Sequence, residues 1–185
     1  TEKRQPTMQF TIKPPVTDKL RSQCMILPVQ AGRLSATGLA FDARLDKALT
    51  SALKSGDLAR KAGSTLLLRG TGGIGRCLLV SVGDGDTVSE KHYQDAARAA
   101  VRVVTGTGAA EAISCLHEAP VTQRELSWRL SQAVLIAREA TYRFEHYKSG
   151  KESTPVQLAE LGFAVSKEDT AAARTTIERM SAVAD

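Results

Sequence analysis

The chain has 185 residues, which is long enough for one folded domain with a substantial hydrophobic core. Hydrophobic residues make up 42% of it and charged residues 24%, as in an ordinary globular protein, and no apolar run approaches the roughly 20 residues that cross a bilayer. The formal net charge of +5 permits contact with nucleic acid without requiring it, while an aromatic content of 4% argues against a surface that stacks bases. We expect no membrane partner.

The N-terminal residues indicate the location of the protein, and the cysteines indicate whether it has disulfides. Thr1–Gln9 lacks the apolar core of a signal peptide, so we expect a cytoplasmic location. Cys24, Cys77 and Cys115 are odd in number, and each stands in an apolar run. Buried free thiols are therefore expected, rather than disulfides or a metal site.

The first third of the chain contains two predicted strands and one predicted helix. Apolar and polar residues alternate over Met8–Ile12, as in a half-exposed strand, and the run Ser22–Val29 is typical of a more buried one. A helix is predicted where apolar residues recur at helical spacing, and Gly56 is placed to end it. These positions are Leu45, Ala48, Leu49, Ala52 and Leu53.

The segment at the centre of the chain predicts a hairpin. The runs Thr65–Leu68 and Cys77–Val82 are apolar without alternation, which is typical of strands covered on both faces. The glycine-rich segment between them resembles a phosphate-binding loop only superficially. Such a loop needs lysine and a hydroxyl residue at the start of a helix, whereas Gly75 is followed by Arg76 and another strand. A structural turn is the favoured interpretation, and a ligand loop is the alternative.

A second glycine turn, Gly83–Asp86, is the better candidate for binding a ligand. It lies between a buried strand and the predicted start of a helix, where free backbone N–H groups favour anions.

Two capping boxes, each a hydroxyl residue followed three positions later by glutamate, predict helix starts at Thr87–Glu90 and Thr122–Glu125. The first helix should end near Gly106, and the second should run to about Tyr147. The buried face expected for the first helix consists of Tyr93, Ala97, Ala100, Val101 and Val104.

The remaining elements complete an alternation of strands and helices. Strands are predicted at Glu111–Leu116 and Gln157–Val165, with a polar loop at Ser149–Thr154 before the second. Ser166 is expected to cap a final helix, Lys167–Ala184, with Ala173, Ile177, Met180 and Ala184 on one face. This order predicts an α/β fold in which a mixed β-sheet is sandwiched between helices.

The long helix that ends near Tyr147 carries two apolar stripes. One stripe is assigned to the core and consists of Leu126, Leu130, Val134, Ala137, Thr141 and Phe144. The other stripe, Trp128, Leu135 and Tyr142, repeats every seven residues on nearly the opposite side. A surface helix needs one stripe only, so the second predicts contact with another layer, domain or subunit. The alternative is that neighbouring arginines such as Arg124 and Arg138 cover these rings with their stems.

Spacing alone identifies no active site. His92, His117 and His146 lack the spacing of metal ligands, no GxSxG motif occurs, and no cysteine has an activating histidine close in sequence. We therefore predict no catalytic, metal-binding or cofactor-binding residue in this chain.

The order of these elements and several segments resemble the N-terminal domain of the cytosolic leucyl aminopeptidase family. The resemblance covers nearly the whole chain and depends on order and spacing more than on any single motif. The segments that carry it are FTIK, SQCMILPV, LDKALTSALKSGDLARKAGSTLLLRG, RCLLVSVGDGDTVSEKHYQDAARAA and EATYRFEHYKSGK.

This resemblance implies a macro-domain-like α/β domain over residues 1–165, with 166–185 as the start of a helix that links to a separate catalytic domain. That second domain would hold two divalent metals, zinc, manganese or magnesium, which activate a bridging water for the removal of N-terminal residues from peptides. The family assembles as homo-hexamers. The segment with its metal ligands would follow this chain, so this chain alone is expected to be inactive.

These features are compatible with three functions. The first is a non-catalytic domain for hexamer assembly and active-site access, with Trp128, Leu135 and Tyr142 as the interface. The second is DNA binding, as in some bacterial relatives of the family, and the third is a macro-like ligand module at Gly83–Asp86. The candidate DNA contacts are Arg124, Arg129, Arg138, Arg143, Lys148 and Lys151.

Overall fold

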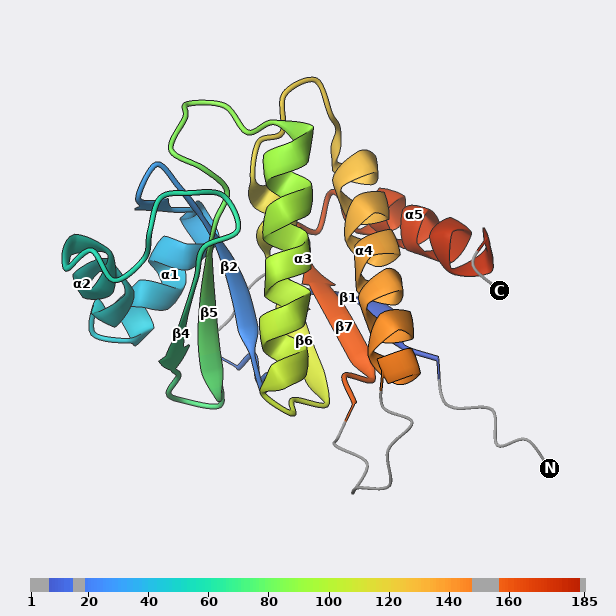
Figure 1. Cartoon of the computed structure of the whole chain (residues 1–185), viewed down its shortest axis with the longest axis horizontal. Coiled ribbons are helices and arrows are strands. Elements are labelled where there is room, and N and C mark those ends of the chain that lie inside the picture. Colours follow the sequence, from blue (N-terminus) through green and yellow to red (C-terminus); the bar gives the residue numbers. More distant parts are fainter. Residues whose placement is uncertain (1–6, 15–18, 148–156, 184–185) are drawn as a thin grey trace.

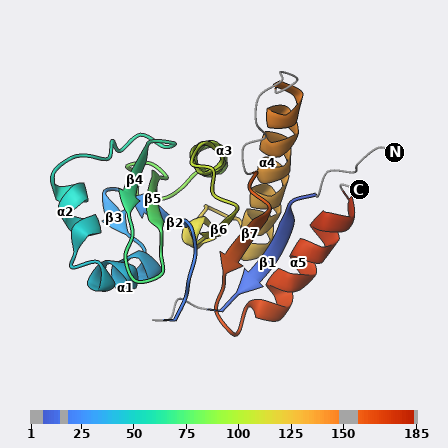
Figure 2. The ribbon, with the colours of Figure 1, turned by 90° about the horizontal axis from the view of Figure 1, so that it is seen from below.

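The computed structural model describes residues 7–14, 19–147 and 157–183 of the chain. A seven-stranded mixed sheet occupies the centre, and helices lie on both of its faces (Figures 1 and 2). The strands are β1 (Gln9–Lys13), β2 (Met25–Gln30), β3 (Arg33–Leu34), β4 (Thr65–Arg69), β5 (Arg76–Ser81), β6 (Glu111–Ser114) and β7 (Glu160–Ala164). The helices are α1 (Ala36–Arg44), α2 (Ala48–Lys54), α3 (Glu90–Gly106), α4 (Leu126–Tyr147) and α5 (Thr170–Val183), with a 3₁₀ turn, η1, at Leu116–Glu118.

The strand order is β1-β7-β6-β2-β5-β4, and β3 pairs with β2. All neighbours from β1 to β5 in this order are parallel, whereas β4 is antiparallel to β5 and β3 is antiparallel to β2. The predicted mixed sheet between helical layers is confirmed. Helices α3 and α4 cover one face, α1 packs on the other, α2 lies beside β4 at the edge of the sheet, and α5 lies against α4 and β1 (Figures 1 and 2).

The central strands are buried as their apolar runs predict, but β4 is not. Residues Met25–Val29 of β2 and Cys77–Ser81 of β5 are buried throughout. Strand β4 is the outermost strand next to β5, and Leu67 at its centre is 37% exposed. The prediction that both runs are covered on both faces is therefore wrong for β4. An edge strand and a central strand can have the same composition, and only the strand order distinguishes them.

The glycine-rich segment joins β4 to β5 as a hairpin loop, so the structural-turn interpretation is confirmed. The loop also pairs with the chain before β2, through a parallel bridge between Ser22 and Ile74. The amide of Ser22 donates to Gly73 O (3.1 Å), and the amide of Gly75 donates to Ser22 O (2.9 Å). These contacts bring two backbones close together, which explains the many glycines without a ligand.

The structure has two helices before Gly56, where the sequence predicts one: α2 lies in the predicted region, and α1 precedes it. Helix α1 begins earlier, with Ser35 Oγ accepting a hydrogen bond from Gly38 N (3.2 Å), and was not predicted. Asp46 and Lys47 have φ of 50° and 60°, and this left-handed pair turns the chain between α1 and α2. Glycine usually occupies that conformation, and non-glycine residues rarely do. Because no glycine stands at this break, the sequence does not reveal it.

Three predicted helix starts are displaced towards the C-terminus. Ser89, not Thr87, caps α3, because its Oγ accepts from His92 N (3.1 Å). Helix α4 begins at Leu126, after Gln123 with a φ of 57°, so Thr122 does not begin it. Ser166 organises a turn through Asp169, and α5 begins only at Thr170.

The cores of the long helices follow the predicted stripes. Tyr93, Ala97, Ala100, Val101 and Val104 of α3 are all buried, as are Leu130, Val134 and Ala137 of α4. Phe144, Ala184 and the loop 149–154 lie outside the part of the chain whose side chains or backbone are described. Cys24, Cys77 and Cys115 are free and buried, as expected, and burial raises the pKa of the Cys24 thiol to about 12 and that of Cys77 to about 11.

Candidate functional site

A cleft of about 510 Å³ lies where the parallel strands β2, β5 and β6 end. The carboxyl ends of parallel strands meet at one edge of a sheet, and this edge is where α/β folds bind ligands. The β2–β3 turn, the start of α1, the β5–α3 loop and the residues after β6 form its walls. Its charged and polar lining consists of Gln30, Arg33, Ser35, Asp86 and Glu118.

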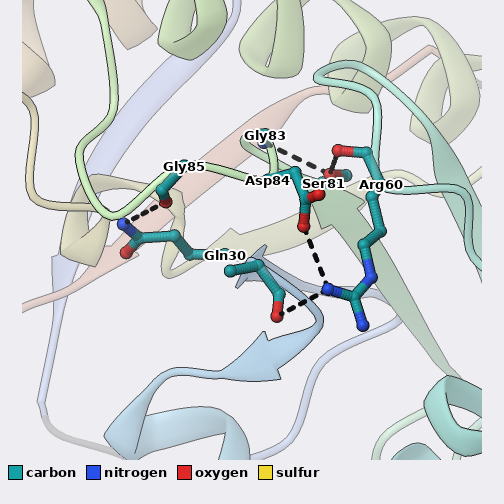
Figure 3. A network of polar contacts seen from close by, with 7 residues as sticks. Gln30, Arg60, Ser81, Gly83, Asp84 and Gly85 are labelled. Carbon is teal, nitrogen blue, oxygen red and sulfur yellow. Dashed lines mark hydrogen bonds and ion pairs between the residues drawn. The ribbon is translucent and has the colours of Figure 1, made fainter.

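The predicted ligand turn, Gly83–Asp86, forms one wall of this cleft. Gln30 Nε2 donates to Gly85 O (3.1 Å) and to Asp86 O (2.8 Å), so carbonyl groups of the turn face the end of β2 (Figure 3). The amide of Gly83 donates to Ser81 Oγ (3.2 Å). Arg60 Nη1 donates to Asp84 Oδ1 (3.0 Å), which ties the turn to the segment before β4 (Figure 3). The turn thus uses its polar groups to fix its own shape.

The start of α1 faces the same cleft, but a carboxylate of the protein already interacts there. Thr37 Oγ1 donates to Glu118 Oε1, which places an acidic group beside the amino end of the helix, where a bound anion would be stabilised. Among the side chains that line the cleft, Arg33 is the cation, and Asp86 and Glu118 are the acids. This charge balance disfavours the binding of a polyphosphate in the cleft. The role of Gly83–Asp86 in binding a ligand stays a prediction.

A neighbouring hollow of about 390 Å³ shares Ala36 and Glu118 with the cleft and has His117 in its wall. His117 Nε2 lies 2.7 Å from Ala164 O, and because a carbonyl can only accept, Nε2 carries the proton. Burial lowers the pKa of His117 from about 6.5 to about 4, and the bond to Ala164 opposes this shift only in part. His117 is therefore a neutral core residue at pH 7, with its Nδ1 buried and unpaired.

The family resemblance assigns its metals to a separate domain, and the described residues of this chain form no metal site. No group of three or more His, Cys, Asp or Glu residues is arranged to hold a metal ion in the part of the chain described. His117 is occupied by Ala164, and the raised pKa values of the buried cysteines keep their thiols protonated.

The second stripe of α4 divides into a covered part and an exposed part. Trp128 packs on Tyr93 of α3 with ring centroids 5.8 Å apart and ring planes tilted by 45°, and the Arg124 guanidinium lies 5.2 Å from the Trp128 ring centroid. At Trp128, the alternative that an arginine covers the ring is therefore confirmed. Leu135 and Tyr142 are 42% and 64% exposed.

The structure does not gather the predicted DNA contacts into one patch. Arg129 donates to the carbonyls of His117 and Ala119, inside the fold. Arg138 lies nine residues further along α4, over the Phe10 ring, and donates to Ser181 O. Arg124 pairs with Glu90 and Arg143 with Glu139. Lys148 and Lys151 lie outside the described residues.

The fold belongs to the macrodomain class of α/β domains. A Trypanosoma brucei macrodomain in complex with ADP superposes with a TM-score of 0.63 at 16% identity, covering 95% of this chain and 69% of that one. A mutant of tomato leucine aminopeptidase superposes with a TM-score of 0.69 at 16% identity, covering 98% of this chain and 37% of that one. At these identities the comparisons show the fold alone.

Sequence comparison identifies the family within this class. The family model "Cytosol aminopeptidase family, N-terminal domain" matches residues 26–151. Probable cytosol aminopeptidases of Paraburkholderia phymatum and Methylobacillus flagellatus are 36% and 35% identical over 168 and 163 residues, which are 89% and 86% of this chain. The chain belongs to the cytosol aminopeptidase family, as its N-terminal domain, and spans about a third of the length of these relatives. No helix among its described residues is long and apolar enough to cross a membrane.

Proposed function

We propose that this chain is the non-catalytic N-terminal domain of a longer cytoplasmic aminopeptidase that removes N-terminal residues from peptides. The observation that carries this proposal is the match of the chain to one third of relatives named cytosol aminopeptidases. By resemblance to the family, the two divalent metals, manganese, zinc or magnesium, would lie in the other two thirds. Residues 166–185 would lead towards that catalytic domain.

The test compares this chain with the longer protein that contains it. Both are assayed with leucine p-nitroanilide in the presence of Mn²⁺. We expect turnover by the longer protein and none by the chain alone. Turnover by the chain alone would mean that it contains an active site, and silence of both would remove the aminopeptidase proposal.

Within the longer protein, we propose that this domain contributes to a homo-hexamer through the exposed part of the α4 stripe. Leu135 and Tyr142 expose 42% and 64% of their surface on one helix, and large apolar side chains of this kind are the anchors of subunit contacts. Light scattering of the double variant Leu135→Ser, Tyr142→Ser in the longer protein should show a smaller assembly. Leu39→Ser, which alters a 57% exposed leucine on α1, is the matched control. An unchanged mass for the double variant would rule out this surface.

DNA binding is a second function for the same domain, supported by the net charge of +5. The exposed arginines Arg124 and Arg143 are each paired with glutamate, so phosphate would have to replace an existing partner. A gel shift at low salt tests the idea, and binding that weakens steeply as salt rises would support it. No shift at low salt would remove it.

Ligand binding at the strand-end cleft is the third function, suggested by the macrodomain that binds ADP. Calorimetry with ADP-ribose should give no heat, because Asp86 and Glu118 repel a diphosphate there. Measured binding would restore Gly83–Asp86 as a ligand site.

A further inference from the structure

A hollow of about 410 Å³ lies between α3 and the segment that leads into β4. Its charged lining consists of Lys61, Asp95, Arg98 and Arg102. The acid is already paired, because Asp95 Oδ2 accepts a hydrogen bond from Lys91 Nζ (2.8 Å) and Asp95 Oδ1 lies 3.5 Å from Arg98 Nη1. Lys61 and Arg102 form no ion pair within the described part of the chain. The hollow therefore carries positive charge that no carboxylate neutralises.

Two further arginines lie on the same face of the sheet, at the far end of β4. Arg76 begins β5, in which Cys77 packs on the α1 side and Leu78 on the α3 side. Because side chains alternate along a strand, Arg76 faces the α3 side, and Arg69, its direct partner in β4, shares that face. Neither arginine is paired with a carboxylate of the described residues, although like charges directly opposite each other are destabilising. A bound anion would relieve this repulsion.

Leu67 lies between these two groups of cations. It pairs with Leu78, so its side chain is on the α3 side of β4, and it is 37% exposed. In Figure 1, β4 lies beside α3, and the helix does not cover it. From Ser64, which lines the hollow, to Arg69 the chain advances about 16 Å, and Leu67 stands a little past the middle. This surface, here called the basic face, combines Leu67 with five cations, which are Lys61, Arg69, Arg76, Arg98 and Arg102.

We propose that the basic face binds an extended acidic segment of a partner protein, in which acidic residues flank an apolar one. The five cations outnumber Asp95 by four, and the net charge of the whole chain is +5, so this face alone has an excess close to that of the chain. Four of the five cations are arginines, and arginine binds a carboxylate through two parallel hydrogen bonds. Carboxylates would bind at either end of the face, and the apolar residue would pack on Leu67.

The leucine favours a peptide over a nucleic acid as the partner. A phosphate backbone carries charge along its whole length and has no apolar group to place on Leu67. The basic face also has no aromatic side chain on which bases would stack. An extended peptide supplies both charged and apolar side chains, and a stretch of about five residues spans the roughly 16 Å of the face.

The first experiment measures the binding of a labelled, N-acetylated octapeptide, Glu-Glu-Glu-Leu-Leu-Glu-Glu-Glu, to this chain by fluorescence anisotropy at low salt. Arg102→Gln and Arg76→Gln each remove a cation from one end of the face, and each should weaken binding roughly threefold or more. Leu67→Ser should weaken it by a similar factor, because the apolar contact is lost. Arg174→Gln is the matched control. This exposed arginine is on α5, which packs on β1 at the opposite edge of the sheet, so binding should not change.

A second peptide tests the apolar contact without altering the protein. Replacing both leucines of the octapeptide with serine keeps its charge, so weaker binding of this peptide to the wild type reports the apolar contact alone. The two peptides should bind Leu67→Ser equally well, because the peptide leucines have lost their partner there. Binding should also weaken as salt rises, because the five cations are exposed.

Three results would overturn the proposal: no binding of the octapeptide at concentrations on the order of 1 mM, no greater effect of Arg102→Gln and Arg76→Gln than of Arg174→Gln, or equal binding of the two peptides to the wild type. The last result, together with displacement of the octapeptide by duplex DNA, would assign the face to nucleic acid instead. The proposal does not rest on the aminopeptidase function or on the α4 stripe, because neither the peptidase assay nor the Leu135 and Tyr142 variants alter this face. Each can fail without the other.

Discussion

Single glycines in the β4–β5 loop have measurable roles. A Cβ added to Gly75 would lie 2.7 Å from Gln23 O, and one added to Gly70 would lie 2.2 Å from Ile74 O. Both obstacles are backbone atoms that cannot move aside. We therefore expect Gly75→Ala to lower the free energy of unfolding by roughly 2 kcal/mol or more, measured by urea denaturation.

The matched control for that substitution is Gly106→Ala at the end of α3. A Cβ there meets nothing within 4 Å. Removing the flexibility of glycine from a helix should stabilise the protein by roughly 0.5–1 kcal/mol. Equal effects of the two substitutions would contradict the packing explanation of this loop and reopen its interpretation as a ligand loop.

His117 makes stability depend on pH. Burial lowers its pKa to about 4 in the folded protein, below the value of about 6.5 in the unfolded chain. The unfolded state therefore binds more protons between these two values, and stability falls as the pH drops from 6.5 towards 4. Between pH 7.5 and 5, His117 should cost roughly 2 kcal/mol of stability.

Urea midpoints at several pH values, for the wild type and His117→Gln, measure this contribution. The variant should lose most of the decline between pH 6.5 and 4.5, because glutamine keeps a donor for Ala164 O and does not titrate. His92→Gln, at an exposed histidine, is the control and should follow the wild type. Parallel curves for wild type and His117→Gln would show that His117 is not the group responsible.

At the scale of elements, two similar hydroxyl residues near the start of α3 have different roles. Ser89 Oγ caps the helix by accepting from His92 N, whereas Thr87 precedes the cap by two residues. Ser89→Ala should cost about 1 kcal/mol in thermal or urea unfolding, and Thr87→Ala should change stability by less than about 0.5 kcal/mol. A larger effect of Thr87→Ala would favour the capping box expected from the sequence.

Periodicity predicts the long elements well and their boundaries less well. The buried face of α3, the core stripe of α4 and the central strands follow from apolar spacing, because burial in one layer imposes one period. The division into α1 and α2 does not follow from apolar spacing, because Asp42 in α1 caps α2 from seven residues away. Its Oδ1 accepts from Leu49 N (2.8 Å), a tertiary contact with no local signal. The edge position of β4 likewise depends on strand order.

At the scale of the whole molecule, the candidate site was only partly visible in the sequence. Gly83–Asp86 is identified because it follows a buried strand and precedes a helix. The opposite walls of the cleft come from Ser35 and Glu118, which are about 50 and 30 residues away in the sequence. Their approach is a consequence of the order β6-β2-β5, and so is the acidic character that disfavours a diphosphate.

The boundary of the folded unit is the remaining property of the whole molecule that a measurement can fix. The sequence places it at 165, with the following residues as the start of a linking helix. In the structure, Ala173 and Ile177 of α5 are 1% and 5% exposed, in the same core as α4. If α5 unfolds together with the rest of the domain, Ile177→Ala should cost roughly 2–4 kcal/mol.

Trp128 provides the probe for this test, because it is the single tryptophan and packs on Tyr93 of α3. A urea transition that is followed by its fluorescence reports on the α3–α4 layer, so a shift caused by Ile177→Ala means that α5 and this layer unfold as one unit. Glu178→Ala, an exposed neighbour, should shift the transition by less than about 0.5 kcal/mol. An unchanged Trp128 transition in Ile177→Ala would instead support a boundary at 165, with α5 acting as an independent linker.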